Sequence, residues 1–546
     1  MNFQYSRYGL TGGEKRLQRF LEALPGACSW AILIGMLGLS FWKPVWAAVV
    51  VIAFHLYWLL RLLFMTLFLV LSYIRLSIER ETDWMGLIRA LEAPESEIPS
   101  DPNGGRGQTF KRRIARALHQ QELRRARRLT GPLPRLGEII HLVIFPVARE
   151  REEIYAQGVE SLLEQGIPLR QILVVLAVEE RSSAEVQAGA ARLARRYRDR
   201  FLSFEVVVHP DGLPGEARVK GANATTAARW AADHLRDRGI PFEKVILSCL
   251  DADTVLSPQY MACLTYQFMI CPDRTRASFQ PIPVYHNNIW EVPGFARVLD
   301  VGSSFFQLVE ATNPEKLVTF SSHSMSFKAL TEVGFWPVDM ISDDSAIFWK
   351  SFIFYEGEYR VVAMYVTVSM DVAASRSWRG TAVNVYRQKR RWAWGVENLP
   401  VVMRAFLKKS RIPLCAKIRH GAKLWEGHLA WATWPFLVAI IGWLPAFFVG
   451  REFSNSVLSY SAPRVTWTIF HLASMSLAIT ICLSVALLPR AAVKRPLLKK
   501  AWHLLEWLLV PVISILFSAI PALDAQTRLA LGRRMEFWVT EKRRIL

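Results

Sequence analysis

Long apolar runs near both ends of the chain are the feature that most constrains its fold. A helix needs about 20 apolar residues to cross the hydrocarbon core of a bilayer. The runs lie at residues 27–42, 45–71, 426–449, 465–488 and 503–520. We therefore predict an integral membrane protein with a transmembrane hairpin over residues 27–74 and transmembrane or re-entrant helices over residues 426–523.

Basic residues predict the orientation of these helices. The segment between the last two apolar runs holds Arg490, Lys494, Arg495, Lys499 and Lys500. The positive-inside bias places such a segment in the cytoplasm, together with residues 1–26 and the polar middle of the chain. The tail, 524–546, is also basic. If all three apolar runs after the polar middle crossed the membrane, the tail would lie on the side opposite the cytoplasm. Either the tail is external or the run at 503–520 is re-entrant. Glu506 and Pro511 within that run favour the re-entrant alternative.

The charge balance narrows the choice of partners. The chain has 67 Lys and Arg against 47 Asp and Glu, a net charge of +20. Such a balance is typical of proteins that bind nucleic acid, anionic lipid or a phosphate-bearing substrate. The apolar runs favour the last two, and no nucleic-acid-binding motif is present, so we expect a lipid bilayer and no nucleic acid. Within residues 75–135, a polar linker precedes a very basic helical segment at 110–128. This segment fits either a solvated helix or a helix that binds lipid headgroups.

The section from residue 136 to residue 375 has the pattern of an α/β domain. Short apolar runs predict strands at residues 138–146, 171–178, 203–209 and 244–250. Helical patterns separate them at residues 152–164, 184–198 and 222–238. This alternation predicts a mostly parallel, Rossmann-like sheet, in which ligands bind at the carboxyl ends of the strands.

Two carboxylates directly follow the last of these strands, at Asp251 and Asp253. Carboxylate oxygens at a strand's carboxyl end suit Mg²⁺ or Mn²⁺, which also take oxygens from substrate phosphates. The alternative is a turn in which these side chains cap a helix. A second acidic pair, Asp343-Asp344, precedes a helical run, where capping is again an alternative. Neighbouring carboxylates raise the pKa of one partner, as a general base requires.

A basic and aromatic cluster lies further along, in a segment at 376–425 that we expect to form interfacial amphipathic helices. It includes Gln388, Arg391 and Trp392. Guanidinium groups can clamp a diphosphate, and an indole ring can stack on a sugar or lie at the membrane interface. Lys220 is a further candidate partner for phosphate or carboxylate.

These clusters, in this order, resemble the motifs of the processive family 2 glycosyltransferases, such as cellulose, chitin and hyaluronan synthases. The family has a DxD, an acidic pair, QxxRW and FxVTxK. The matching residues are Asp251-Ala252-Asp253, Ser342-Asp343-Asp344, Gln388-Lys389-Arg390-Arg391-Trp392 and Phe537-Trp538-Val539-Thr540-Glu541-Lys542. The resemblance implies a GT-A domain in the cytoplasm, a nucleotide-sugar donor, a Mg²⁺ or Mn²⁺ cofactor and a polysaccharide or lipid-linked acceptor. It also implies the inner membrane of a bacterium and secretion partners.

The resemblance assigns a role to each matching residue. Asp253 would coordinate the cation, and Asp251 would help to bind the nucleotide. Asp344, beside Asp343, would be the general base that deprotonates the acceptor hydroxyl. Arg391, Thr540 and Lys542 would contact the donor, with Lys220 as a further donor contact, whereas Trp392 and Gln388 would contact the acceptor. The transfer would invert the anomeric centre.

The chain also departs from the family pattern. Glu179-Glu180 stands where relatives often carry aspartates near the nucleotide base, which leaves GDP open beside UDP. His323 lies where relatives contact the acceptor and is a candidate contact, with a structural histidine as the alternative.

Three other functions fit parts of the sequence. The closest is the transfer of one sugar to a polyprenyl or glycolipid acceptor. The residues from Asp251 to Thr254 also fit the first motif of haloacid dehalogenase-like phosphatases, but three strand-like runs precede them, and in those enzymes that motif ends the first strand. The third is a non-catalytic membrane protein that binds nucleotide-sugars.

Overall fold

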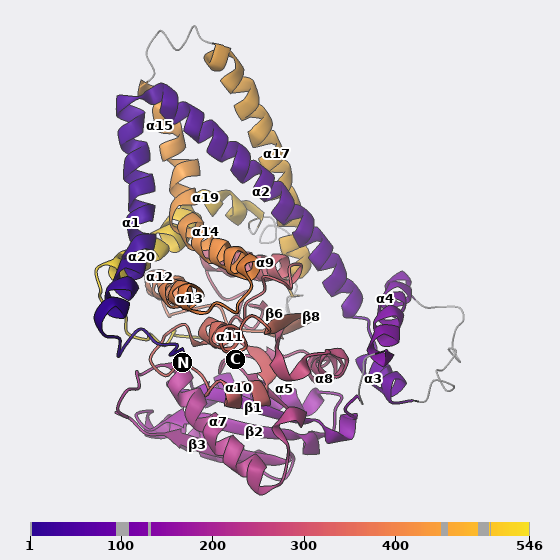
Figure 1. Cartoon of the computed structure of the whole chain (residues 1–546). Coiled ribbons are helices and arrows are strands. Elements are labelled where there is room, and N and C mark those ends of the chain that lie inside the picture. Colours follow the sequence, from indigo (N-terminus) through magenta and orange to yellow (C-terminus); the bar gives the residue numbers. More distant parts are fainter. Residues whose placement is uncertain are drawn as a thin grey trace.

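The computed structural model describes residues 3–93, 109–128, 133–448, 457–489, 502 and 504–544. A group of long helices stands on an α/β domain (Figure 1). Among the described residues, four helices are long and apolar enough to cross a membrane: Gly12–Trp42, Pro44–Glu79, Trp467–Leu487 and Glu506–Ala530. The prediction of membrane-crossing helices at both ends of the chain is thus supported by length and composition.

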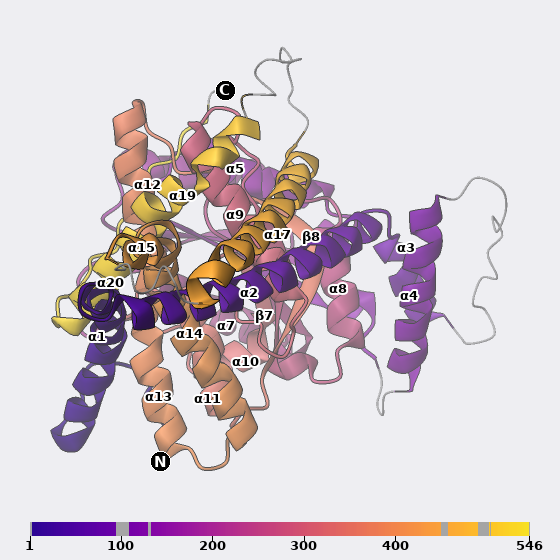
Figure 2. The ribbon, with the colours of Figure 1, turned by 90° about the horizontal axis from the view of Figure 1, so that it is seen from above.

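The first two of these helices form the expected hairpin. Helix α1 (Gly12–Trp42) ends at Lys43, and α2 (Pro44–Glu79) begins directly after it with a proline in its first turn. Proline has no N–H to continue the preceding helix but suits the first position of a new one, so Lys43-Pro44 reverses the chain. Seen from above, α2 runs from α1 to the far side of the domain, where α3 (Trp84–Glu92) and α4 (Phe110–Arg127) stand (Figure 2).

The apolar run at 426–449 does not form one long helix within its described part. Helix α14 (Leu414–Ala439) ends where Ile440 leaves the helical conformation, at φ −128° and ψ −67°. A 3₁₀ turn (Ile441–Trp443) and the short helix α15 (Leu444–Phe448) follow. Gly442 and Pro445 explain the break, since glycine and proline are the residues least favourable within a helix. Helix α17 (Val457–Leu487) then returns toward the domain (Figure 1).

The last apolar segment is also irregular. It consists of a 3₁₀ turn (Glu506–Leu509), α19 (Val510–Ser514), a π turn (Ile515–Ala519) and α20 (Ile520–Ala530). Helix α20 packs closely on α1: a Cβ on Gly26 would lie 2.8 Å from the carbonyl oxygen of Gln526, and Ser29 Oγ donates to Gln526 Oε1 at 2.7 Å. The tail after α20 runs into the α/β domain (Figure 1). The tail and the domain therefore lie on the same side of the long helices, as the re-entrant alternative requires.

The α/β domain contains an eight-stranded sheet within the described residues, in the order β3-β2-β1-β4-β7-β6-β8-β5. The strands are β1 (Ile140–Val147), β2 (Ile172–Glu179), β3 (Ser203–His209), β4 (Val245–Cys249), β5 (Val255–Leu256), β6 (Ala277–Val284), β7 (His323–Ser326) and β8 (Arg360–Ser369). Strands β1 to β4 are parallel and match the four predicted runs, while β7 is antiparallel to both of its neighbours. The predicted fold class, a mostly parallel open sheet with membrane-type helices, is confirmed.

Helices cover both faces of the sheet, which explains why β1 and β2 are mostly apolar and almost wholly buried. One face packs on α5 (Glu152–Ser161), α6 (Ala184–Tyr197) and α8 (Tyr260–Ile270). The other packs on α7 (Lys220–Asp237), α10 (Phe327–Glu332), α11 (Asp343–Phe354) and α13 (Asn398–Lys408). Two further helices, α9 (Gly294–Ala311) and α12 (Trp378–Ala393), lie between the sheet and the long helices (Figure 1).

A buried histidine attaches the basic helix α4 to the end of α2. The His119 ring lies between two carboxylates, with Nε2 2.8 Å from Glu79 Oε2 and Nδ1 2.9 Å from Glu122 Oε2. The rings of Trp84 and Tyr266 close the site. Burial alone would lower the pKa of His119, but hydrogen bonds to Glu122 and Glu79 outweigh it and raise the pKa to about 9. The imidazolium is therefore the dominant form at neutral pH.

We predict that His119→Leu destabilises this attachment, because it leaves the buried Glu79 carboxylate without its main partner. Breaking a buried ion pair costs about 3 kcal/mol. The measurement is thermal unfolding of the purified protein in neutral detergent, with Gln120→Leu at the neighbouring exposed position as the control. Because folding raises this pKa, the stabilisation is complete below about pH 6.5 and is lost as the pH rises through about 9. Equal melting temperatures for the two variants would contradict the role.

Candidate active site

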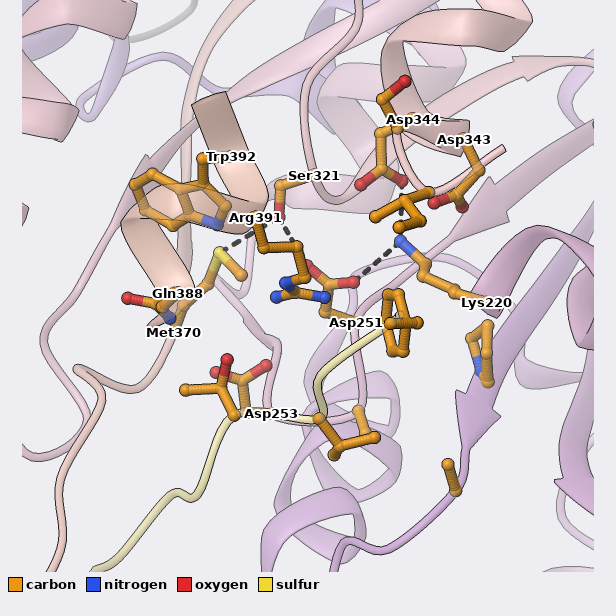
Figure 3. Close-up of a pocket in the computed structure, with 18 of the residues that line it drawn as sticks. Lys220, Asp251, Asp253, Ser321, Asp343, Asp344, Met370, Gln388, Arg391 and Trp392 are labelled. Carbon is orange, nitrogen blue, oxygen red and sulfur yellow. Dashed lines mark hydrogen bonds and ion pairs between the residues drawn. The ribbon is translucent and has the colours of Figure 1, made fainter. Parts of the chain in front are cut away.

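A cavity opens at the carboxyl ends of the strands, between the sheet, α12 and the tail (Figure 3). Most of the predicted site residues line it, although they come from distant parts of the chain. These are Glu179, Lys220, Asp251, Asp253, Asp343, Asp344, Gln388, Arg391, Trp392, Thr540 and Lys542. The strand-end rule thus predicted the edge of the sheet at which this cavity lies, and the roles of its residues stay predictions.

Two predicted residues do not line this cavity. His323 lies in β7, opposite Cys249 of β4, with only 1% of its surface exposed, and its Nδ1 lies 2.9 Å from the carbonyl oxygen of Ser321. Its burial within the sheet makes it a structural histidine, so the assignment as an acceptor contact is wrong. Glu180 does not line the cavity, and it accepts a hydrogen bond from the N–H of Asp211. Only Glu179 of that pair reaches the cavity.

Asp251 is held by a cation and a hydroxyl. Its Oδ1 lies 2.7 Å from Lys220 Nζ, and its Oδ2 accepts a hydrogen bond from Ser321 Oγ at 2.5 Å (Figure 3). Although burial opposes ionisation, Lys220 and Lys542 lower the pKa of Asp251. Ser321 has a φ of 51°, in the left-handed region that only a few per cent of non-glycine residues adopt. Such strain persists where the surroundings enforce it, here through the hydrogen bond to Asp251.

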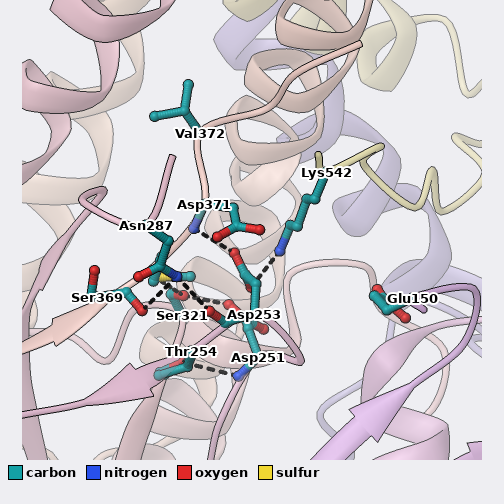
Figure 4. Close-up of polar contacts among 12 residues, drawn as sticks. Glu150, Asp251, Asp253, Thr254, Asn287, Ser321, Ser369, Asp371, Val372 and Lys542 are labelled. Atoms are coloured by element: carbon teal, nitrogen blue, oxygen red, sulfur yellow. Dashed lines mark hydrogen bonds and ion pairs between the residues drawn. The ribbon is translucent and has the colours of Figure 1, made fainter. Parts of the chain in front are cut away.

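Asp253 is fully buried and uses both of its oxygens. Oδ2 accepts a hydrogen bond from the N–H of Asp371 at 2.8 Å, and Oδ1 forms an ion pair with Lys542 of the tail (Figure 4). Asp371 adds a third carboxylate, paired with Arg544 at 2.8 Å. Burial and the neighbouring Asp253 raise the pKa of Asp371 to about 6. The tail therefore supplies two cations to a group of buried carboxylates.

The acidic pair begins helix α11. Asp344 Oδ1 lies 2.6 Å from Lys220 Nζ, so one ammonium group bridges Asp344 and Asp251 (Figure 3). Burial raises the pKa of Asp344 to about 6, with Lys220 acting in the opposite direction. Burial and the charge of Asp344 raise the pKa of Asp343 well above its usual value. Both carboxylates stand in the first turn of a helix, where negative charge is favourable, and both also face the cavity.

Helix α12 supplies the basic and aromatic wall of the cavity. The Trp392 ring packs edge-on against Phe320, at 5.6 Å between centroids. The Arg391 guanidinium lies 4.7 Å from the ring centroid of Phe537, so the tail covers α12. Arg391 and Gln388 reach the cavity between Trp392 and the carboxylates (Figure 3).

The residues present fit a divalent cation that is shared with a phosphate-bearing ligand. Among the described residues, no three His, Cys, Asp or Glu side chains converge on one point. Asp251 and Asp253 are nevertheless ionisable oxygen donors in a buried position, where a charge must be compensated. Mg²⁺ commonly binds one or two carboxylates and takes further oxygens from substrate phosphates and water.

Sequence reasoning missed Asp371, Arg544 and Glu397. Asp371 follows β8 by two residues, so the strand-end rule would have found it had this strand been recognised. Arg544 carried no signal, because its partners, Asp371 and Gln157, are far away in sequence. Glu397 was missed for the same reason.

The buried carboxylate of Glu397 holds the loop that carries the acidic pair. Oε1 accepts hydrogen bonds from the N–H groups of Ile341 and Ser342, both at 2.9 Å, and from Ser342 Oγ at 2.8 Å. Oε2 accepts from Trp394 Nε1 at 2.9 Å and lies 3.6 Å from Arg7 Nη1. Because Trp394 directly follows α12, this network fixes the acidic pair relative to α12.

A comparison with known proteins finds one matching family. Residues 246–492, less than half of the chain, match the model of the family described as Glycosyl transferase family group 2. The matched section contains Asp251, Asp253, Asp343, Asp344 and the α12 residues, and it supports a glycosyltransferase family 2 domain with transferase activity. This match favours the transferase over the phosphatase alternative. No curated protein matches the chain in sequence.

Solved glycosyltransferase structures show a distant likeness. One is a mannosyltransferase from Pyrobaculum calidifontis in complex with GDP-Man and Mn²⁺, with a TM-score of 0.40 and 14% identity, covering 72% of this chain and 94% of that one. Another is residues 1–349 of S. aureus TarS in complex with UDP, with a TM-score of 0.35 and 12% identity, covering 74% of this chain and 95% of that one.

We predict that Glu397→Ala loosens the loop before the acidic pair. The substitution leaves buried N–H groups of Ile341, Ser342 and Trp394 without an acceptor, at a cost of about 1–3 kcal/mol each. Hydrogen exchange measured by mass spectrometry should speed up in peptides covering residues 339–346. Glu164→Ala, which removes an exposed carboxylate, is the control. Unchanged exchange in those peptides would rule out a positioning role for Glu397.

Proposed function

We propose that this chain is a membrane-embedded, inverting glycosyltransferase that transfers a sugar from a UDP-sugar to a growing polysaccharide on the cytoplasmic face of a bacterial inner membrane. The observation that carries the proposal is the convergence of four motifs in one cavity. Asp251 and Asp253, Asp343 and Asp344, and Arg391 meet there with Lys542, which lies almost 300 residues after the first of them.

The donor would bind along the carboxylates and cations of the cavity. Asp251 and Asp253 would hold Mg²⁺ or Mn²⁺, which when bound supplies positive charge to the leaving nucleotide diphosphate. Arg391 and Lys542 would bind diphosphate oxygens, since a guanidinium or ammonium makes short, charge-assisted hydrogen bonds to phosphate. Glu179, at the end of β2, would lie toward the nucleotide base. Two of the similar solved structures are named as complexes with GDP-Man and with UDP, which is consistent with a nucleotide-sugar donor.

The reaction would be a single displacement at the anomeric carbon. Asp344 would take the proton of an acceptor hydroxyl, whose oxygen would bond to that carbon as the bond to the diphosphate oxygen breaks on the opposite face. Inversion follows from this geometry, by the logic that applies to inverting glycosidases. Arg391 would neutralise charge that grows on the leaving oxygen, a form of stabilisation that is often the largest part of catalysis. Asp343 lies beside the base, and burial and the charge of Asp344 raise the pKa of Asp343.

The acceptor would enter from the α12 side of the cavity. Trp392 offers an indole face for a sugar ring, and Gln388 lies one turn before it on α12. Because α12 lies under the long helices, the product would leave toward the membrane (Figure 1). The Q-x-x-R-W spacing favours a polymer as the product, coupled to secretion. The alternative acceptor, a polyprenyl or glycolipid, would reach the same wall from the bilayer.

We predict that Asp344→Asn reduces transfer by at least about 10²-fold while donor binding stays within a few-fold, because an amide cannot accept the proton. Protein in lipid nanodiscs would be given a panel of UDP- and GDP-sugars with Mg²⁺, Mn²⁺ or EDTA. Nucleotide release and the size of radiolabelled product would both be measured. Asp237→Asn, at an exposed position of α7, is the matched control. A fully active Asp344→Asn variant would refute the base assignment, and a single lipid-soluble adduct would refute polymerisation.

We also predict how the rate of transfer depends on pH. Asp344 must be deprotonated to act as a base, and burial raises its pKa to about 6. The value of kcat/KM should therefore fall as the pH drops through about 6, tenfold per pH unit at the limit, and should level off above it. The apparent value belongs to the coupled acidic pair rather than to one residue. A profile that stays flat down to pH 4.5 would exclude a carboxylate base with this pKa.

A further inference from the structure

Helix α4 has one side packed on the protein and one basic side turned outward. Its buried side includes Ala115, His119 and Ala126. Its exposed basic residues include Arg113, Arg124, Arg125 and Arg128. Since an α-helix turns once in 3.6 residues, Arg113, Arg124 and Arg128 lie opposite Ala115 and Ala126. Among the described residues, no acidic side chain forms an ion pair with any of these four arginines.

The position of this helix is fixed at the end of a candidate membrane span. Lys111 Nζ donates to Ser77 Oγ of α2 at 2.6 Å, and the His119 ring contacts Glu79, the last residue of α2. Figures 1 and 2 both show α4 beside the end of α2 that is remote from α1, next to the α/β domain. The first half of α4 is therefore held against the last turn of α2, and the outward arginines lie along the same helix.

We infer that the outward face of α4, formed by Arg113, Arg124, Arg125 and Arg128, binds the headgroups of anionic phospholipids. The positive charge of this face favours an anionic partner. Because α4 is attached to the end of a candidate membrane span, the anionic groups expected beside it are lipid headgroups. Basic side chains near an anionic bilayer each gain about 1 kcal/mol, and this gain falls off within a Debye length of the surface.

Lipid binding by these four arginines would also affect where the α/β domain lies relative to the bilayer. Helix α4 packs through His119 against Tyr266 of α8, which covers one face of the sheet. Binding of α4 to headgroups would thus hold the sheet next to the bilayer at a point distant from α1 and α20. The inference does not depend on the reaction proposed above, because its measurement is lipid binding.

The test uses the full-length protein in a neutral detergent, titrated with phosphatidylglycerol or phosphatidylcholine that carry a fluorophore on an acyl chain. We expect tighter binding of phosphatidylglycerol than of phosphatidylcholine. The variant Arg113→Gln/Arg124→Gln/Arg125→Gln/Arg128→Gln should bind phosphatidylglycerol at least about tenfold more weakly, with phosphatidylcholine binding unchanged. These residues are exposed, and the His119 attachment is left intact, so the melting temperature serves as a check that the variant is folded.

A control of equal charge separates this site from the general basicity of the chain. It neutralises four exposed arginines on or just after α6, which lies on the α/β domain: Arg195, Arg196, Arg198 and Arg200. This control should keep the preference for phosphatidylglycerol. Two outcomes would overturn the inference: an equal loss of phosphatidylglycerol binding in the control, or an unchanged preference for phosphatidylglycerol in the α4 variant.

Discussion

One buried ammonium group organises the active site. Lys220 Nζ lies between Asp251 and Asp344, which come from different elements about 90 residues apart. Two ionised carboxylates so close together would repel each other and would be costly to bury, so the cation is what allows both to face one cavity. Lys220 begins α7, and the neighbouring Gly221 lets that helix approach α11: a Cβ there would meet the Cβ of Asp343 at 2.9 Å. The spacing of the two acidic motifs thus depends on the start of one helix.

The long helices, which are candidates for crossing a membrane, also contribute to the site. Helix α20 packs on α1 and also on α12, where Arg390 Nη1 donates to Asp524 Oδ2 at 2.9 Å. The tail that follows brings Lys542 to Asp253 and Arg544 to Asp371. Two of the cations that compensate the buried carboxylates are therefore supplied by the segment that follows the long helices. The α/β domain alone would leave Asp253 and Asp371 without these partners, which links the electrostatics of the site to the membrane part of the chain.

The sequence predicted those parts of the structure whose signal is local. Strands β1, β2 and β4 are mostly apolar runs, and the acidic and Q-x-x-R-W clusters follow them in an order that matched a known family. Two strands in the second half of the sheet gave no such signal. Strand β6 contains Pro281 and Pro283, and β7 has only four residues, His323–Ser326, three of them polar. The failure to recognise β7 as a strand is also why His323 was taken for an acceptor contact, since nothing nearby indicated that its ring lies within a sheet.

Asp253 shows how the position of the tail and the binding of a cation depend on each other. This carboxylate is fully buried, and the N–H of Asp371 occupies one of its two oxygens. The other oxygen pairs with Lys542, so each oxygen already has one partner. A divalent cation at Asp253 would share an oxygen with one of these partners or displace Lys542, and a displaced ammonium group would need a new anionic partner. A donor diphosphate would provide this anionic partner beside the same carboxylate. The position of the tail would therefore depend on whether the cation and the donor are both bound.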